Sequence, residues 1–536
     1  MPIRRPSPFL ITSITLALAF SAALLLPAYP SGDANQAPKY GGVLRVKGFF
    51  TPFDTVFDPV SASHTFVVEQ LFDGLVRLDS NFNIVPSLAE YWKISDGGRR
   101  MVFYLRKGVK FHNGRELTAG DVKFSLERLI KKTAGGRVFP YFAGKVPGTE
   151  ELVAGTAEEV RGFKVLDDHT FEVDWTRPYV SGLYLFAMSY CKVLPRDLVD
   201  SQGGRFFQKP VGTGPFKFSS WLRSSRLDIL GVRLERNLSY FGGRPYLDGI
   251  DYSPYFTDDQ FDEGLVHIVP VVSERMLRRE NLVLENTSLR NLYLAFSCHL
   301  PPLDRPELRR ALALGIDKAR LAEACSTASS EFRVMESFIP PSLPGFYPRD
   351  AVSAYDPEKA RMLISRLIGQ DEGKKLTLAL LLSSPKNELA GAIGRELARQ
   401  LGLMGISLDV NYLRRPQDAR DFDRPYLKLL DYRMDFPDAE DIILPLFSSG
   451  SELNGLNCRY ANPRLDELLR TAEVESGWEK RLASFRAMED ILAADMPALP
   501  LFSEFVRIAV SPTVRGMMTP AIGFWSLDTK GIWLQK

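Results

Sequence analysis

Cysteine is scarce in this chain, which has four Cys among 536 residues. A small scaffold held together by many disulfides is therefore excluded, and at most two bridges are possible. A surplus of charge of one sign is also missing, because 67 Lys and Arg residues stand against 65 Asp and Glu residues, for a formal net charge of +2. No strong field draws such a chain to nucleic acid, so nucleic acid is not expected among its partners.

The sequence also lacks the common motifs of catalytic and metal sites. It contains no Walker A loop, no G-x-S-x-G elbow, no H-E-x-x-H pair and no C-x-x-C pair. The five His residues are scattered, without the spacing of metal ligands. Ser383 and Lys386 match the S-x-x-K motif of penicillin-binding enzymes, but such a tetrapeptide often arises by chance. The chain is therefore predicted to be no enzyme and to hold neither a metal ion nor another cofactor.

Long hydrophobic runs are restricted to the N-terminus. Arg4 and Arg5 precede an uncharged stretch over residues 6–32, whose apolar part is residues 9–26. A positive start, an apolar stretch and small residues in this order are typical of a secretory signal. We therefore predict that residues 1–37 are a cleaved signal peptide with a short leader and that the mature protein is periplasmic. A retained membrane anchor is the alternative, because 18 apolar-rich residues nearly span a bilayer.

The remaining sequence alternates between strand and helix patterns. Leu376–Leu382 is an apolar strand, Asn387–Leu401 has a helical pattern, and Ile406–Tyr412 is a second strand. Strand, helix and strand at this spacing predict a crossover unit with parallel strands. The predicted fold class is therefore α/β.

Other elements are predicted from local patterns. Alternating apolar residues predict strands over 101–106 and 171–176. Thr118 and Asp121 fit a capping box at the start of an amphipathic helix. Further on, Asp304 is predicted to cap a helix that has Pro306 in its first turn.

The segment from Trp92 to Arg128 is the most specific part of the sequence. It contains the turn Phe111-His112-Asn113-Gly114 and the helix start Thr118-Ala119-Gly120-Asp121-Val122. It closely resembles the hallmark of the family 5 extracellular solute-binding proteins, which are the dipeptide-, oligopeptide- and nickel-binding components of bacterial ABC importers. Other motifs agree in the right order across Lys39–Pro520. These motifs are Tyr40-Gly41-Gly42, Leu71-Phe72-Asp73-Gly74-Leu75, Val211-Gly212-Thr213-Gly214-Pro215-Phe216, Arg309–Asp317 and Tyr460-Ala461-Asn462-Pro463.

The resemblance implies a two-lobe periplasmic-binding-protein fold of the type II kind, with an extra domain inserted in the first lobe. Carried onto this chain, domain I is residues 38–57, 164–288 and 497–536. The inserted domain II is residues 58–163, and domain III, the second lobe, is residues 289–496. Hinge closure of the lobes around a ligand is then expected.

An acidic loop over residues 431–441 is the main candidate for ligand contact, because it is similar to a ligand-binding segment of the family. In peptide-binding members, the aspartate that corresponds to Asp435 binds the α-ammonium group of the ligand. A carboxylate suits this role because it makes charge-assisted hydrogen bonds in a closed cleft. The neighbouring candidates for ligand contact are Tyr432, Phe436 and Asp438. Two departures from the family pattern, Ala439 and the pair Asp441-Ile442, bear on the ligand more than on the fold.

Weaker candidates lie elsewhere in the chain. Ser63 and His64 fall where family clefts often have a loop facing the ligand, and a surface loop is the alternative. Asn457 lies in a Gly/Asn-rich stretch, for which turn chemistry is the alternative. Cys298 and Cys458 both fall in the implied domain III, so the expectation is either a disulfide after export or two buried thiols.

The resemblance implies a monomeric binding protein of an ABC importer. It would capture peptides, di- or oligopeptides, between two closing lobes and deliver them to a membrane permease that a separate ATPase drives. Two alternatives remain open, namely a non-peptide solute such as a metal–chelator complex, an opine or an oligosaccharide, and a membrane-anchored ligand sensor. A hydrolase on the same fold is disfavoured because no nucleophile–base pair is visible.

Overall fold

A computed structural model describes most of the chain after the N-terminal segment. It covers residues 37–49, 53–61, 64–134, 138–278, 283–343, 346, 354–369, 376–384, 387–518, 520 and 522–535. The predicted signal peptide, apart from Ala37, lies outside these residues. Within the same ranges, every helix is too short or too polar to cross a membrane.

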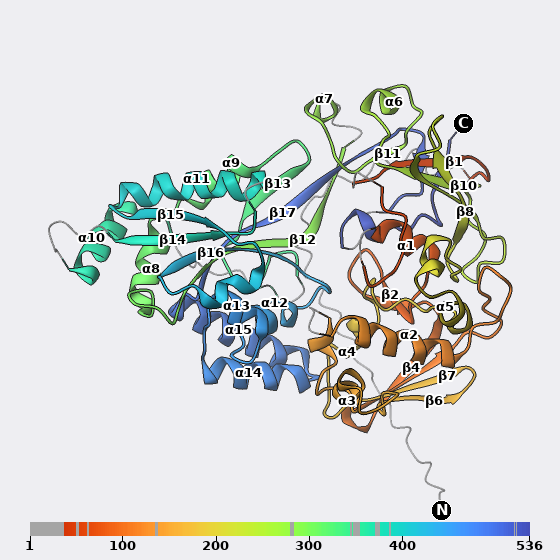
Figure 1. Cartoon of the computed structure of the whole chain (residues 1–536), viewed down its shortest axis with the longest axis horizontal. Coiled ribbons are helices and arrows are strands. Elements are labelled where there is room, and N and C mark those ends of the chain that lie inside the picture. The colour runs from red at the N-terminus through yellow and green to blue at the C-terminus, as the bar shows by residue number, and fades with distance from the viewer. Residues whose placement is uncertain are drawn as a thin grey trace, which may run out of the picture. The chain divides into compact units, whose positions relative to one another are not determined.

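The largest sheet has eleven strands among the described residues and mixes parallel with antiparallel pairs (Figure 1). Its main path is, in spatial order, β15 (Ser407–Tyr412), β14 (Thr377–Leu382), β16 (Tyr426–Arg433), β12 (Val283–Phe296), β17 (Ala498–Val510), β11 (Ile268–Val269), β1 (Val43–Lys47), β10 (Gly249–Ser253), β9 (Ile229–Arg236) and β8 (Phe216–Arg223). The short strand β13 (Ser330–Val334) pairs with β17 beside this path. The sheet therefore joins strands from both ends of the chain.

The predicted crossover unit is confirmed. β14 and β15 pair in parallel and are connected by helix α11 (Glu388–Leu403). The Asn387 side chain caps this helix by accepting a hydrogen bond from the Ala390 N–H, at 3.1 Å. The apolar face of α11 packs on one face of β14, and the other face of β14 is covered by a separate cluster that includes Tyr426.

Two long strands connect the halves of this sheet. β12 and β17 pair antiparallel along most of their length, and Figure 1 shows them side by side. Their register shifts between Thr287 and Asn291, where Leu289 has a left-handed φ of 53°. A non-glycine residue in this region is strained and marks a local irregularity. The irregularity is tied to the acidic loop, because the Leu289 carbonyl accepts a hydrogen bond from the Met434 N–H, at 3.1 Å.

A second sheet of four antiparallel strands carries the segment that resembles the family hallmark. Its order is β4 (Ala89–Ser95), β5 (Arg100–Leu105), β7 (Thr170–Asp174) and β6 (Phe163–Asp167). The predicted capping box is present at the start of helix α2 (Ala119–Lys132), where Thr118 and Asp121 bond reciprocally. We call residues 75–193 the small-sheet module, because one hydrophobic cluster fills it. Its other elements are β2 (Val76–Leu78), β3 (Ile84–Pro86), α3 (Thr149–Ala154) and α4 (Gly182–Leu185).

Helices cover the end of the large sheet that contains β14–β16. We call residues 289–498 the C-terminal module, which two further hydrophobic clusters fill, one of them extending to Phe502 of β17. Its remaining helices are α8 (Pro306–Leu314), α9 (Lys318–Cys325), α10 (Pro357–Ile368), α12 (Glu440–Phe447), α13 (Glu452–Asn457), α14 (Pro463–Val474) and α15 (Trp478–Asp495). The prediction that Asp304 caps α8 is wrong by one residue. Pro306 occupies the first helical position, so Arg305 is the cap residue.

The remaining elements surround β1 and β8–β10. They are α1 (Thr65–Leu71), α5 (Arg196–Gln202), α6 (Asp258–Asp262), α7 (Glu274–Leu277), β18 (Val514–Arg515) and β19 (Trp533–Leu534). The glycine turn around Gly212 packs closely against the end of α1. A Cβ on Gly212 would lie only 1.9 Å from the Leu71 carbonyl oxygen, so glycine is required at this position. His112 holds the turn in place. Its Nδ1 accepts from the Gly212 N–H and its Nε2 pairs with the Gly214 carbonyl, both at 3.1 Å. The hallmark turn thus positions α1.

Candidate ligand-binding site

A cavity of about 510 Å³ lies beside the end of β16. Its walls come from segments far apart in the sequence, including the start of α1, the middle of β17 and the C-terminal segment around Trp525. Two carboxylates, Asp435 and Glu504, face it together with one guanidinium, Arg433. The other walls combine aromatic and aliphatic side chains with a few hydroxyl groups. A ligand would therefore meet a few charged groups set in an apolar surface, as in many small-molecule sites.

Asp435 is presented to this cavity by a tightly held turn. The carboxylate of Asp441, six residues further on, accepts the N–H of Asp435 at 2.5 Å and the N–H of Phe436 at 3.0 Å. Its other oxygen accepts from the hydroxyl groups of Tyr432, at 3.0 Å, and Tyr141. These four donors fix the backbone from which the Asp435 side chain projects.

Asp441 itself is completely buried. Burial raises the pKa of Asp441 well above its usual range, and the nearby Asp435 carboxylate raises it further. The hydrogen bonds from Tyr141 and from the two backbone amides act in the opposite direction. Asp441 therefore stabilises the turn, while Asp435 is the carboxylate that reaches the cavity.

The second carboxylate, Glu504, already has several partners. It accepts hydrogen bonds from Ser288 at 2.6 Å, Arg290 at 2.8 Å and Ser330 at 3.2 Å. Arg433 is a more distant partner, with 4.0 Å between its Nη2 and Oε2 of Glu504. The Arg433 guanidinium instead stacks on Trp525, 4.4 Å from the ring centre. Glu504 thus has its charge compensated before any ligand binds.

His64 lines the same cavity from the start of α1. Its ring stacks on Phe53, with 4.6 Å between ring centres and an interplanar angle of 29°. Burial lowers the pKa of His64 below its usual value, which favours the neutral imidazole at pH 7. His64 therefore lines the cavity as a neutral ring and not as a cation.

The structure brings together two of the residues predicted to bind ligand, Asp435 and His64, and places four others away from the cavity walls. Tyr432 is buried behind the turn and donates to Asp441. Phe436 is buried in the hydrophobic cluster of the small-sheet module. Asp438 forms a buried bidentate ion pair with Arg481, at 2.7 and 2.8 Å. The carbonyl of Asn457, also buried, accepts from the Tyr426 hydroxyl at 2.8 Å.

Ser63, the remaining predicted site residue, lies outside the described residues.

For Cys298 and Cys458, the sequence left open either a disulfide or two thiols. Cys298 and Cys458 are free thiols, although the Cys298 N–H donates to the Cys458 carbonyl at 2.9 Å. Burial raises the pKa of the Cys298 thiol to about 11.

A second cavity, of about 370 Å³, adjoins the first. The two cavities share Ser189, Ile522 and Trp525 as wall residues. Two cations in the second cavity, Arg106 and Lys530, donate to backbone carbonyls, at 2.9 and 2.7 Å respectively. Within the described part of the chain, neither of them contacts a carboxylate. The same cavity also contains three carboxylates, of which Glu69 pairs with Lys192 and Asp528 with Arg77, so Arg106 and Lys530 are cations in a site of mixed charge.

Glu504 and Trp525 also line the cavity, although neither was predicted from the sequence. Glu504 lies in the apolar strand β17, and one acidic residue within such a strand is the only signal that could have singled it out. Trp525 follows an irregular C-terminal segment and has no motif around it. Groups of three or more His, Cys, Asp or Glu residues arranged for a metal ion do not occur among the described residues.

Comparison with known proteins identifies the family. Residues 83–454 match the family model of the bacterial extracellular solute-binding proteins, family 5. The chain belongs to this family. The match covers more than two thirds of the chain and confirms the resemblance seen in the sequence.

Individual relatives of this family 5 protein are similar over nearly their whole length. The peptide transport periplasmic protein SapA of Salmonella typhimurium is 27% identical over 507 residues, which is 87% of this chain and 88% of SapA. The dipeptide-binding protein of Escherichia coli is 26% identical over 488 residues, or 84% of this chain and 87% of that protein. The crystal structure of a dipeptide-binding protein from Pseudoalteromonas sp. SM9913, in complex with Met-Leu, covers 92% of this chain and 100% of its own, with a TM-score of 0.70 and 22% identity. The predicted two-lobe fold is therefore confirmed.

Proposed function

We propose that this protein is the periplasmic peptide-binding component of an ABC importer and that Asp435 binds the α-ammonium group of the peptide. The observation that supports this most directly is the position of Asp435, which lines the cavity on a turn held by four hydrogen-bond donors. The relatives named above are described as peptide or dipeptide binders. A binding role without turnover agrees with the family and with the missing catalytic motifs. Transport would require a permease and a separate ATPase.

The same proposal includes the domain boundaries predicted from the sequence. The boundary before residue 289 falls at the register shift and the left-handed Leu289 of β12. The boundary before residue 497 falls between α15 and β17. The first boundary thus lies at the irregularity of the strand pair, whereas the second lies at the start of β17, because Ala498 pairs with Ala295 and the residues opposite the irregularity are Ser503–Phe505. A pair of strands with a local irregularity is suited to bend as a hinge, which would close the cavity around a ligand.

The two adjoining cavities suggest how a peptide would lie. With its ammonium group at Asp435, the peptide would extend past Trp525 toward Arg106 and Lys530. These cations would then receive the C-terminal carboxylate or an acidic side chain through charge-assisted hydrogen bonds. The aromatic walls between the ends would contact side chains with little selectivity.

Calorimetry with Asp435→Asn tests this proposal. The substitution keeps the size of the side chain but removes the charge, so an enclosed ammonium group would lose its counter-charge. Loss of one member of such a pair costs about 2–5 kcal/mol, or about 30- to 5,000-fold in affinity. N-acetylation of the peptide should weaken binding to the wild type in the same way, and Asp435→Asn should discriminate much less between the two peptides.

Asp409→Asn is the matched control, because Asp409 is an exposed carboxylate paired with Arg424 on the surface of the same module. Asp438 is unsuitable as a control because its carboxylate is buried against Arg481. The natural ligand would be identified by mass spectrometry of small molecules released when the purified protein is denatured. Release of a sugar or a chelate, or wild-type affinity of Asp435→Asn for its ligand, would contradict the proposal.

A further inference from the structure

The turn that carries Asp435 is also the point where the two modules meet. We call residues 435–441 the Asp435 loop, and Asp435 is its one side chain on the cavity wall. The ring of Phe436 packs against Tyr141 and Tyr184 of the small-sheet module, with ring centres 5.4 and 6.1 Å apart. Among the residues described, Phe436 is the only fully buried member of that hydrophobic cluster from outside residues 75–193. The loop is thus inserted into the small-sheet module.

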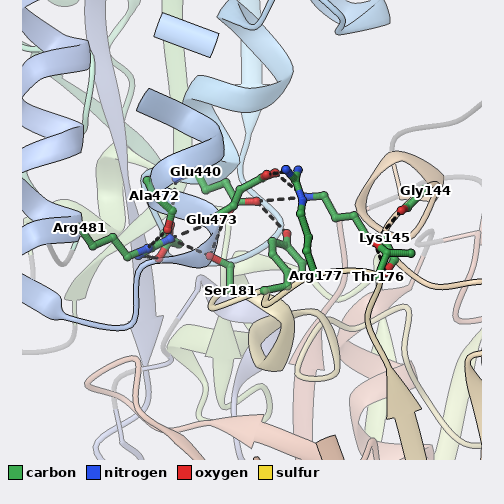
Figure 2. A network of polar contacts seen from close by, with 11 residues as sticks. Gly144, Lys145, Thr176, Arg177, Ser181, Glu440, Ala472, Glu473 and Arg481 are labelled. Atoms are coloured by element: carbon green, nitrogen blue, oxygen red, sulfur yellow. Dashed lines mark hydrogen bonds and ion pairs between the residues drawn. The ribbon is translucent and has the colours of Figure 1, made fainter. Parts of the chain in front are cut away.

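A network of polar contacts joins the two modules next to this insertion, and Figure 2 shows residues of both modules in it. Glu440, at the start of α12, accepts hydrogen bonds from Tyr179 at 2.8 Å and from Ser181 at 2.7 Å. Lys145 bridges Glu440 and Glu473, at 3.3 and 2.9 Å. These contacts join the two modules directly, because three of the residues belong to the small-sheet module and two to the C-terminal module.

The same cluster is balanced in charge. Its acids are Asp438, Glu440 and Glu473, and its bases are Lys145, Arg177 and Arg481. All but Arg177 are buried or nearly so. Arg481 completes the connection by donating to Ser181 across the module boundary, at 2.8 Å (Figure 2). Because buried charges are tolerated only when paired, this cluster favours one relative position of the modules.

A hydrogen bond from the small-sheet module also reaches the carboxylate that holds the backbone of Asp435. Tyr141 of the small-sheet module donates to one oxygen of Asp441, and the other oxygen holds the N–H groups of Asp435 and Phe436. If the modules separate, Asp441 loses its Tyr141 partner and Phe436 loses its apolar surroundings. The turn would then lose the contacts that orient the Asp435 side chain.

We propose that Tyr141, Tyr179 and Ser181 are positioning residues, which dock the Asp435 loop and thereby set the affinity of a cavity that they do not line. This inference rests on the proposed role of Asp435 in ligand binding. Docking of the loop and binding of the ligand stabilise each other, and by linkage each strengthens the other to the same extent. Affinity is therefore determined in part by a contact outside the cavity.

Tyr141→Phe and Tyr179→Phe test the inference, since each removes one hydroxyl group and keeps the ring. We expect each variant to bind a free-amine peptide about 5- to 150-fold more weakly, the usual range of coupling between two sites. Tyr141→Phe should also discriminate less between free and N-acetylated peptides, which a purely structural defect would not cause. Tyr91→Phe is the matched control, because Tyr91 is an exposed tyrosine of the same module.

Hydrogen–deuterium exchange of the ligand-free proteins provides a second readout that does not depend on the ligand. The amides of Asp435 and Phe436 and the start of α12 should exchange faster in Tyr141→Phe than in the wild type or in Tyr91→Phe. Failure of the wild type to bind any peptide would count against the proposed function, while the exchange result would still stand. Wild-type affinity, wild-type discrimination and unchanged exchange in Tyr141→Phe would overturn the inference. Ser181→Ala replaces Tyr179→Phe if the latter does not fold.

Discussion

The hallmark turn contains His112, whose protonation should make the stability of the folded protein depend on pH. His112 holds the glycine turn through both ring nitrogens, and burial lowers the pKa of His112 to about 4. Nδ1 accepts the Gly212 N–H, so a proton on this nitrogen would break that hydrogen bond. We therefore expect His112→Gln, which removes the titrating group, to lose less stability on acidification than the wild type.

The sign and the size of this effect follow from proton linkage. An unfolded His has a pKa of about 6.5, so between pH 6.5 and about 4 the unfolded state binds more protons than the folded state. Stability is therefore fully present above pH 6.5 and decreases as the pH falls. At pH 5, which is about 1.5 units below the pKa of the unfolded His, protonation stabilises the unfolded state by about 2 kcal/mol, because each unit contributes about 1.36 kcal/mol. Below pH 4 the loss reaches about 3 kcal/mol.

Chemical denaturation followed by circular dichroism at pH 7.5 and pH 5 measures this difference. Other titrating groups, such as His267 and Asp73, are shared by both proteins and cancel in the comparison. At pH 7.5 the wild type should have a higher free energy of unfolding than His112→Gln, and this difference should be smaller by about 2 kcal/mol at pH 5. His169→Gln, in the turn between β6 and β7, is the matched control because it removes an imidazole outside the glycine turn. An equal loss of stability in the wild type and in His112→Gln would refute the reasoning.

Two further predictions concern the ligand. A peptide with a C-terminal amide should bind at least about 10-fold more weakly than the free acid, because a charge-assisted hydrogen bond contributes about 1.5 kcal/mol or more, and calorimetry with Arg106→Met should show that this preference is reduced. A saturating peptide should also reduce the radius of gyration in small-angle scattering, because closure about β12 and β17 moves whole modules, and an unchanged profile would contradict the hinge.

Elements with a strong local pattern were predictable from the sequence. The crossover β14–α11–β15 follows from an apolar strand, a capped helix and a second strand, each readable within about 16 residues. The capping box of α2 is equally local, because Thr118 and Asp121 are three residues apart. The path of the large sheet is different. Its centre pairs β17 with β11 and β11 with β1, and no local pattern specifies pairing between residues more than 200 positions apart.

The cavity was predictable only in part, for the same reason. Asp435 and His64 were singled out because they lie in segments that resemble known ligand loops. Glu504 and Trp525 reach the cavity from a strand and a tail whose sequences carry no such signal. Their role depends on the placement of β17 and of the C-terminal segment, which is a property of the assembled fold.

The acidic loop shows why adjacent residues of one type have different roles. From composition alone, its five carboxylates are equivalent candidates for a cationic ligand. The structure separates them by their partners. Asp431 pairs with Arg290, Asp438 with Arg481 and Glu440 with Lys145, while Asp441 binds the backbone of the turn. A carboxylate that is compensated in this way gains little from a ligand cation, because it would have to give up an existing partner. Of the five carboxylates, Asp435 is the one that lines the cavity, so a ligand ammonium group inside the cavity would meet this carboxylate directly.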